Sequence, residues 1–126
     1  MGNTAGIEDT LWRLGRLMLE RDPAIADEFV ADAMLVGSEP GEVARGREAI
    51  RALFAGIHAQ PYRVTWQWDS VDATVEGETG WFFAEGSVVI DDAGPERRLA
   101  YRLAGVLQQL DGQWRWRLFH GSEPRV

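Results

Sequence analysis

The sequence predicts an α+β domain in which helices come first and a curved, mostly antiparallel sheet follows. Up to Pro61 the apolar residues recur at helical spacing, and beyond it they alternate with a period of two. Near the end of the chain, Asp111-Gly112 lies between two apolar runs, which is a strong short-range signal for a β-hairpin. With no repeat or low-complexity linker, we expect a single domain over residues 1–126.

Three helices are expected in the N-terminal half. The first has an apolar stripe at helical spacing and Asn3 or Thr4 as its cap; the stripe is Ile7, Leu11, Leu14 and Met18. Asp22-Pro23 ends this helix and begins a short second one, with the aspartate as cap and the proline at the first helical position. A brief strand at 34–36 and a turn at 38–42 precede the third helix, at about 47–58.

Four strands are expected after Pro61, because alternation places successive side chains on opposite faces of a sheet. Val64, Trp66 and Trp68 share one face of the first of them. In the next, Trp81, Phe83, Glu85 and Ser87 alternate with Phe82, Ala84, Gly86 and Val88. The last two, 99–109 and 113–122, form the final hairpin.

The residue pattern of the final strand predicts the concave wall of a ligand site, apolar at one end and polar at the other. Uninterrupted alternation would put five side chains on one face, namely Trp114, Trp116, Leu118, His120 and Ser122. The hairpin register then decides what lies opposite them, because a slip of one residue exchanges the two faces.

Two hairpin registers are open. A two-residue turn, Asp111-Gly112, pairs Leu110 with Gln113 and turns Arg102 away from His120. A three-residue loop directly opposes positions 102 and 120, so that Arg102 and His120 share a face. We favour the three-residue loop, which places Ala104 beside the bulky Leu118.

The same stretch resembles the C-terminal hairpin of the SnoaL-like branch of the NTF2-like superfamily. The similarity lies in Arg102 with Val106 beyond it, in Asp111-Gly112 and Trp114, and in the closing His120-x-Ser122. Residues 37–42, followed by Gly46-Arg-Glu-Ala-Ile50, resemble the turn that opens the third helix of that family, although Ser38 and Glu39 replace its Thr and Asp.

This resemblance implies an NTF2-like cone, in which three helices pack on a curved mixed sheet and enclose a pocket, usually in a dimer. It also implies an inward-facing arginine at position 102. Ketosteroid isomerases of the superfamily have a tyrosine in the first helix, where this chain has Trp12. That departure weakens the isomerase interpretation.

Composition excludes several classes of partner. The chain has 45% hydrophobic and 26% charged residues, an ordinary globular balance, and a formal net charge of −7. Nucleic acids and anionic membranes require clustered basic residues, so neither is an expected partner. The absence of cysteine excludes disulfides and thiolate chemistry.

Without a signal peptide or an apolar run of roughly 18 residues, we expect a cytoplasmic protein.

No metal or cofactor is expected. The two histidines, His58 and His120, lie far apart and neither has the spacing of a metal motif. No glycine-rich loop follows a strand in the context that nucleotide binding requires. Ser122 lacks the elbow motif of a nucleophilic serine.

The candidate site combines acid–base and binding residues. His120 and Glu85 are the candidate catalytic groups, and Arg102 is the candidate clamp for a carboxylate. Trp66, Trp116 and Ser122 are expected to line the same cavity. A buried guanidinium needs a partner, which would be Glu85 or a bound anion. Each residue also has an ordinary structural role open to it, as a core aromatic, a surface ion pair or a satisfied histidine.

Three functions follow from this site. The protein is a small-molecule-binding domain with Arg102 and His120 at the base of an apolar pocket, a cofactor-free isomerase, cyclase or dehydratase, or a non-catalytic dimerisation module. The ligand would be small, and apolar or carboxylate-bearing. A homodimer is expected through the outer sheet face, where Tyr101, Leu103 and Phe119 would otherwise be exposed.

Overall fold

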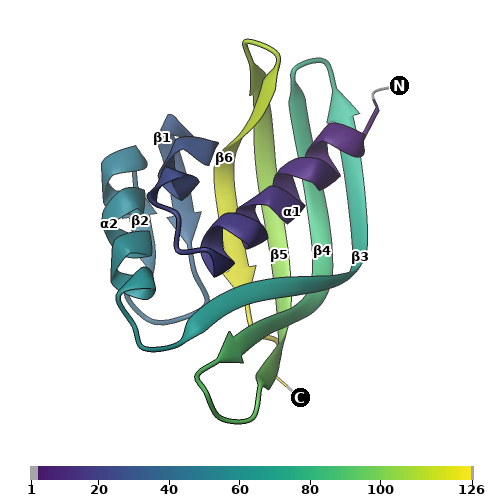
Figure 1. Cartoon of the computed structure of the whole chain (residues 1–126). Helices are drawn as coiled ribbons and strands as arrows, with labels where there is room; N and C mark the ends of the chain where they lie inside the picture. Colours follow the sequence, from purple (N-terminus) through teal and green to yellow (C-terminus); the bar gives the residue numbers. More distant parts are fainter. Residues whose placement is uncertain (1–2, 126) are drawn as a thin grey trace.

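A computed structural model describes residues 3–125 of the chain. Its helical elements are α1 (Ala5–Leu19), the 3₁₀-helix η1 (Pro23–Glu28) and α2 (Arg47–His58). Its strands are β1 (Phe29–Val36), β2 (Val43–Arg45), β3 (Arg63–Glu76), β4 (Thr79–Asp91), β5 (Arg97–Leu110) and β6 (Gln113–Ser122). The predicted α+β class is confirmed (Figure 1). The second helix is a 3₁₀-helix, the strand expected at 34–36 begins at Phe29, and the short strand β2 was not predicted.

The signals that predicted the helices act as expected. All four apolar residues of the α1 stripe are buried. The side chain of Asp22 accepts a hydrogen bond from the Ala24 N–H at 2.9 Å, and Pro23 opens η1. At the start of α1, Thr4 occupies the cap position without a side-chain bond, and Asn3 Oδ1 instead accepts from the Ala5 N–H at 2.8 Å.

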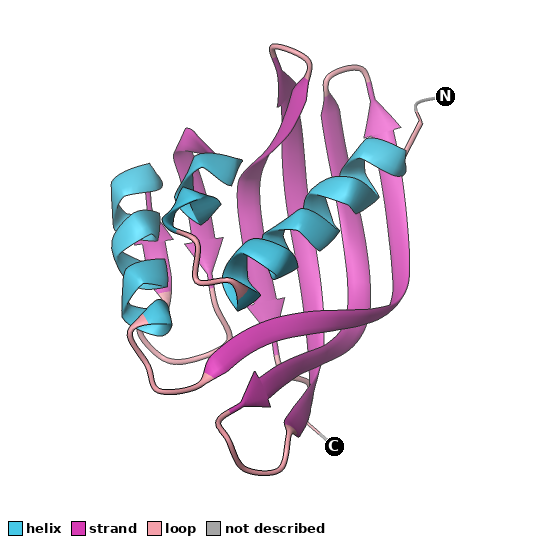
Figure 2. Ribbon diagram, in the orientation of Figure 1, coloured by secondary structure: helices cyan, strands magenta, loops and turns pink. Residues whose placement is uncertain are grey.

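The six strands form one mixed sheet in the order β2-β1-β6-β5-β4-β3. β1 runs parallel to β6, and the other neighbouring pairs are antiparallel. α1 lies diagonally across one face of this sheet, and α2 lies beside β1 and β2 (Figure 1). The first part of β3 sweeps beneath the end of α1 (Figure 2), so the sheet is strongly curved. We call the face under α1 the inner face.

Aromatic side chains fill the core between α1 and the inner face. Trp116 is fully buried and contacts Phe82 edge-on, with ring centroids 5.4 Å apart, and Phe29 at 6.0 Å. Gly105 lies beneath these rings, where a Cβ atom would come within 2.6 Å of Phe82. Glycine is therefore needed there for close packing rather than for backbone flexibility.

The final hairpin has the two-residue turn, so the expected three-residue loop is wrong. Leu110 pairs with Gln113, and Asp111 and Gly112 have φ angles of 51° and 78°. Two consecutive positive φ angles match the twist of a tight hairpin, and Asp-Gly is well suited to adopt them.

A β-bulge at Arg117 interrupts the alternation of β6. Val106 pairs with Leu118 and Leu107 pairs with Trp116, which leaves Arg117 without a partner on β5. A bulge inserts one residue and so reverses the faces of the residues beyond it. The expectation that residues 114–122 keep a single alternation is therefore wrong.

The bulge also changes which residues of β6 lie on the outer face. Beyond it, Phe119 points into the core, whereas His120 and Ser122 lie on the exposed outer face. Tyr101 and Leu103 are buried on the inner face, so the expectation that they and Phe119 cover the outer face is wrong.

Candidate functional site

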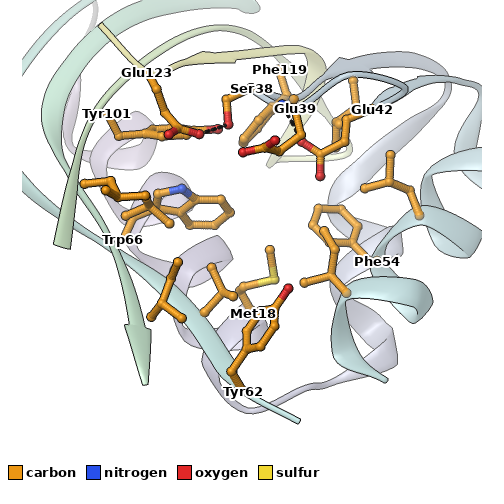
Figure 3. A pocket seen from close by; sticks show the side chains of 18 residues that line it. Met18, Ser38, Glu39, Glu42, Phe54, Tyr62, Trp66, Tyr101, Phe119 and Glu123 are labelled. Carbon is orange, nitrogen blue, oxygen red and sulfur yellow. Dashed lines mark hydrogen bonds between the residues drawn. The ribbon is translucent and has the colours of Figure 1, made fainter. Parts of the chain in front are cut away.

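A cavity of about 370 Å³ lies between the C-terminal end of α1, α2 and the inner face of the sheet (Figure 3). Most of its wall is apolar: Met18, Leu35, Leu53, Phe54, Ile57, Val64, Trp66, Val88, Ile90, Leu99 and Phe119. Its volume falls within the range of about 300–1,000 Å³ that is usual for small-molecule sites.

The turn between β1 and β2 supplies part of the polar end of the cavity. The Gly37 N–H donates to the Glu42 carbonyl at 2.7 Å, and Glu42 Oε1 accepts from the Glu39 N–H at 3.0 Å. Ser38 Oγ donates to Glu123 Oε2 at 2.6 Å, joining this turn to the segment after β6. Ser38 and the three glutamates consequently all reach the cavity wall.

Tyr101 lies at this polar end with 5% of its surface exposed. Burial raises the pKa of its phenol well above the ordinary value of 10, and the charge on Glu42 raises it further. Ser38 and the Trp66 indole favour the phenolate but do not offset burial. The phenol therefore stays protonated at neutral pH and can donate a hydrogen bond.

Trp66 forms the adjoining wall and is 6% exposed. Its ring packs against Trp68, Tyr101 and Phe119, with centroids 6.4, 6.2 and 5.8 Å away. The Trp66 Nε1–H lies near the Tyr101 oxygen and so favours the phenolate form of Tyr101. The Nε1 atom itself is buried, and no acceptor among the described residues meets it with good hydrogen-bond geometry. In Figure 3 this nitrogen lies on the edge of the ring toward Tyr101, at the polar end of the cavity.

One of the six predicted site residues, Trp66, lines the cavity. Trp116 lies in the core and does not line it. The other four lie on the exposed outer face: His120, Ser122, Arg102 and Glu85. His120 and Ser122 lie there because the bulge reverses the faces of β6. Arg102 lies there because it is the sequence neighbour of the inward-facing Tyr101 on β5. The expected inward placement of these four residues is wrong.

Arg102 does meet one of its two expected partners, but on the outer face. Its Nε lies 3.4 Å from Glu85 Oε2, and each side chain is about half exposed. Ser122 is the cross-strand neighbour of Arg102 on β6, whereas His120 lies opposite Ala104. This cluster is a surface ion pair with polar neighbours, and no cavity encloses it.

Sequence reasoning missed the polar end that the cavity does have. Tyr101, Glu42 and Glu123 were not candidates, although Tyr101 shares its parity with the apolar Leu103 and Leu107 of the same strand. That parity is the signal that could have placed the phenol inside. Glu42 and Glu123 lie in a turn and beyond the last strand, where alternation gives no information.

The described residues form neither a three-residue metal cluster nor a membrane-spanning helix. Among residues 3–125, no group of three His, Cys, Asp or Glu side chains is arranged to hold a metal ion, the three glutamates at the cavity included. No helix in this range is long and apolar enough to cross a membrane.

An α+β cone with a cavity between its helices and its curved sheet defines a class of protein, and comparisons place the chain within that class. Residues 7–125 match the family model of the SnoaL-like domain, so the chain belongs to the SnoaL-like family. Solved structures similar to it include NTF2-like proteins. No curated protein matches the sequence.

Three solved structures illustrate the similarity. A protein of unknown function from Mycobacterium tuberculosis is 23% identical with a TM-score of 0.84, over 96% of this chain and 71% of that one. ActVI-ORFA of Streptomyces coelicolor is 18% identical with a TM-score of 0.82, over 97% of both chains. A proposed dehydratase of the NTF2-like family from Streptomyces avermitilis is 18% identical with a TM-score of 0.81, over 96% of both. At these identities the likeness establishes the fold alone.

Proposed function

We propose that the protein binds a small, largely apolar molecule in the cavity, through one hydrogen-bond acceptor held at the polar end. The observation that carries this proposal is the buried Trp66 Nε1–H, which lies beside the protonated Tyr101 phenol and has no hydrogen-bond partner of good geometry among residues 3–125. A buried donor left unpaired costs about 1–3 kcal/mol. A ligand oxygen at this position would remove that cost.

The test is calorimetric titration with 2-naphthalenemethanol, which offers an apolar body and one oxygen. We expect Trp66→Phe to weaken its binding, because the donor is lost while an aromatic ring remains. Trp68→Phe is the matched control, since Trp68 stacks on Trp66 but does not line the cavity. Equal losses in the two variants, or binding that survives blockage of the cavity by Leu53→Trp, would contradict the proposal.

An acid–base enzyme of the isomerase, cyclase or dehydratase type is the second candidate. The observation that favours it is a protonated phenol, Tyr101, in the same cavity as the carboxylate of Glu42. Such a pair could polarise a carbonyl and remove a proton from the adjacent carbon. The proposed dehydratase among the similar structures agrees with this class without establishing it.

Exchange of the α-protons of 2-tetralone in D₂O, followed by NMR, tests the second candidate. Catalysed exchange should fall about 100-fold or more in Tyr101→Phe and in Glu42→Gln, the usual contribution of one acid–base group. Exchange no faster than in buffer would leave ligand binding as the function.

A homodimer through the outer face belongs to the same proposal. Its apolar band, here called the outer band, comprises Trp81, Phe83, Ala104, Val106 and Leu118 on three adjacent strands. Trp81 and Phe83 are 41% and 43% exposed, which is unusual for aromatic side chains on one sheet face. Light scattering should give twice the 14.1 kDa chain mass for the parent protein and the mass of one chain for Phe83→Asp. A monomeric parent protein would refute the interface.

A further inference from the structure

We propose that the ligand of the cavity is an organic cation, an apolar amine that carries its positive charge at the polar end. This inference rests on the proposed binding function and specifies the chemistry of the ligand. It departs from the expectation of a carboxylate-bearing ligand, which depended on an inward-facing Arg102.

The first support is an unbalanced charge at one end of the cavity. Glu39, Glu42 and Glu123 line it, and no lining residue in the described chain is Arg, Lys or His. None of the three carboxylates forms an ion pair with a basic side chain of residues 3–125. In Figure 3 the carboxylates gather along the same side of the cavity. An anion placed there would face repulsion without a compensating cation.

The second, independent support comes from the aromatic wall beside the carboxylates. Trp66, Tyr101 and Phe119 pack against one another there and all three line the cavity. Aromatic residues are the usual neighbours of a bound organic cation. Trp66 is more than nine-tenths buried, and its Nε1–H, which has no partner of good geometry in the described part of the chain, lies at the same end of the cavity (Figure 3). This donor would bind an oxygen next to the charged group of the ligand, so an amine with a neighbouring hydroxyl or ether oxygen fits both features.

The glutamates keep free acceptor positions with which they could bind an ammonium group. Glu123 uses Oε2 to accept from Ser38, and Glu42 uses Oε1 to accept from the Glu39 N–H. A carboxylate offers about four acceptor positions on its two oxygens, so each retains free positions for an ammonium group. Both side chains are half-buried at the wall of the cavity, where screening by salt is weaker than on the open surface.

Calorimetric titration with three compounds of matched shape tests the inference: 2-naphthylmethylamine, 2-naphthalenemethanol and 2-naphthoate. At low salt we expect the amine to bind about tenfold more tightly than the alcohol, and the naphthoate to bind most weakly. The double variant Glu42→Gln/Glu123→Gln should abolish the preference for the amine over the alcohol. Glutamine keeps the oxygens that Ser38 and the Glu39 N–H require.

The control variant is Glu76→Gln/Glu78→Gln, which removes the same two charges from the exposed end of the β3–β4 hairpin. It should keep the preference for the amine and thereby separate local charge from the net charge of the protein. Tighter binding of the naphthoate, or a preference for the amine that persists in the Glu42/Glu123 double variant, would overturn the inference while leaving the binding function in place. Binding of none of the three compounds would overturn both.

Discussion

Gly121→Ala should disturb the polar end of the cavity through a single methyl group. Gly121 is buried on β6, opposite Leu103 and directly beneath the phenol of Tyr101. A Cβ at this position would overlap the hydroxyl oxygen and lie 2.6 Å from Cζ, whereas ordinary contacts begin at about 3.4 Å. The ring would have to retreat by about 0.8 Å to relieve the contact with Cζ alone, and further to clear the hydroxyl oxygen, within a packed aromatic wall. Overpacking of this kind costs roughly 1–3 kcal/mol.

Urea denaturation measures the loss of stability, and calorimetric titration with 2-naphthalenemethanol measures the effect on binding. Tyr101→Phe should recover part of the stability lost in Gly121→Ala, because it removes the overlapping oxygen and leaves the Cζ contact. Gly56→Ala is the matched control: it lies in α2 with open space around it, so it should stabilise the protein by about 0.5–1 kcal/mol. If Gly121→Ala were as stable as the parent protein, the phenol would not pack over Gly121, and the geometry of the polar end would be wrong.

Two further predictions concern residues outside the cavity. Arg102→Ala should change the free energy of unfolding by less than about 1 kcal/mol and leave ligand binding intact, because Arg102 and Glu85 form a half-exposed surface pair; a larger loss in urea denaturation would contradict this. Burial lowers the pKa of His58 below 6.5, and the charge on Arg21 adds to this effect. The unfolded chain then takes up the proton more readily, so this contribution to stability is complete above about pH 6.5 and is lost as the pH falls below it. His58→Gln should flatten this part of the pH–stability profile.

The course of the chain could be predicted from the sequence because its signals are local. Helical spacing located α1 and α2, the Asp22-Pro23 pair located η1, and the switch to a period of two after Pro61 located the long strands. Each of these signals acts within a few residues, so no knowledge of distant contacts is needed. Trp66 was placed correctly for the same reason, since the alternation of β3 is regular through that position.

The site could not be predicted in the same way because one inserted residue decides which face β6 presents. Trp116 and Phe119 are three apart, an odd separation that strict alternation would place on opposite faces, and yet both are buried and pack at 5.5 Å. The bulge at Arg117 resolves this conflict by letting both rings enter the core. Burying two large aromatic side chains outweighs the loss of one rung of strand pairing.

This packing has a direct chemical consequence for the cavity. Once Phe119 turns inward, His120 must turn outward, and Arg102 lies on the same outer face because β5 turns Tyr101 inward. The polar end is then formed by Tyr101, by the β1–β2 turn and by Glu123, just beyond the end of β6. The bulge that completes the aromatic core therefore keeps His120 out of the cavity, whose charged lining residues are Glu39, Glu42 and Glu123. Because no lining residue in the described chain is basic, we expect the cavity to select a cation.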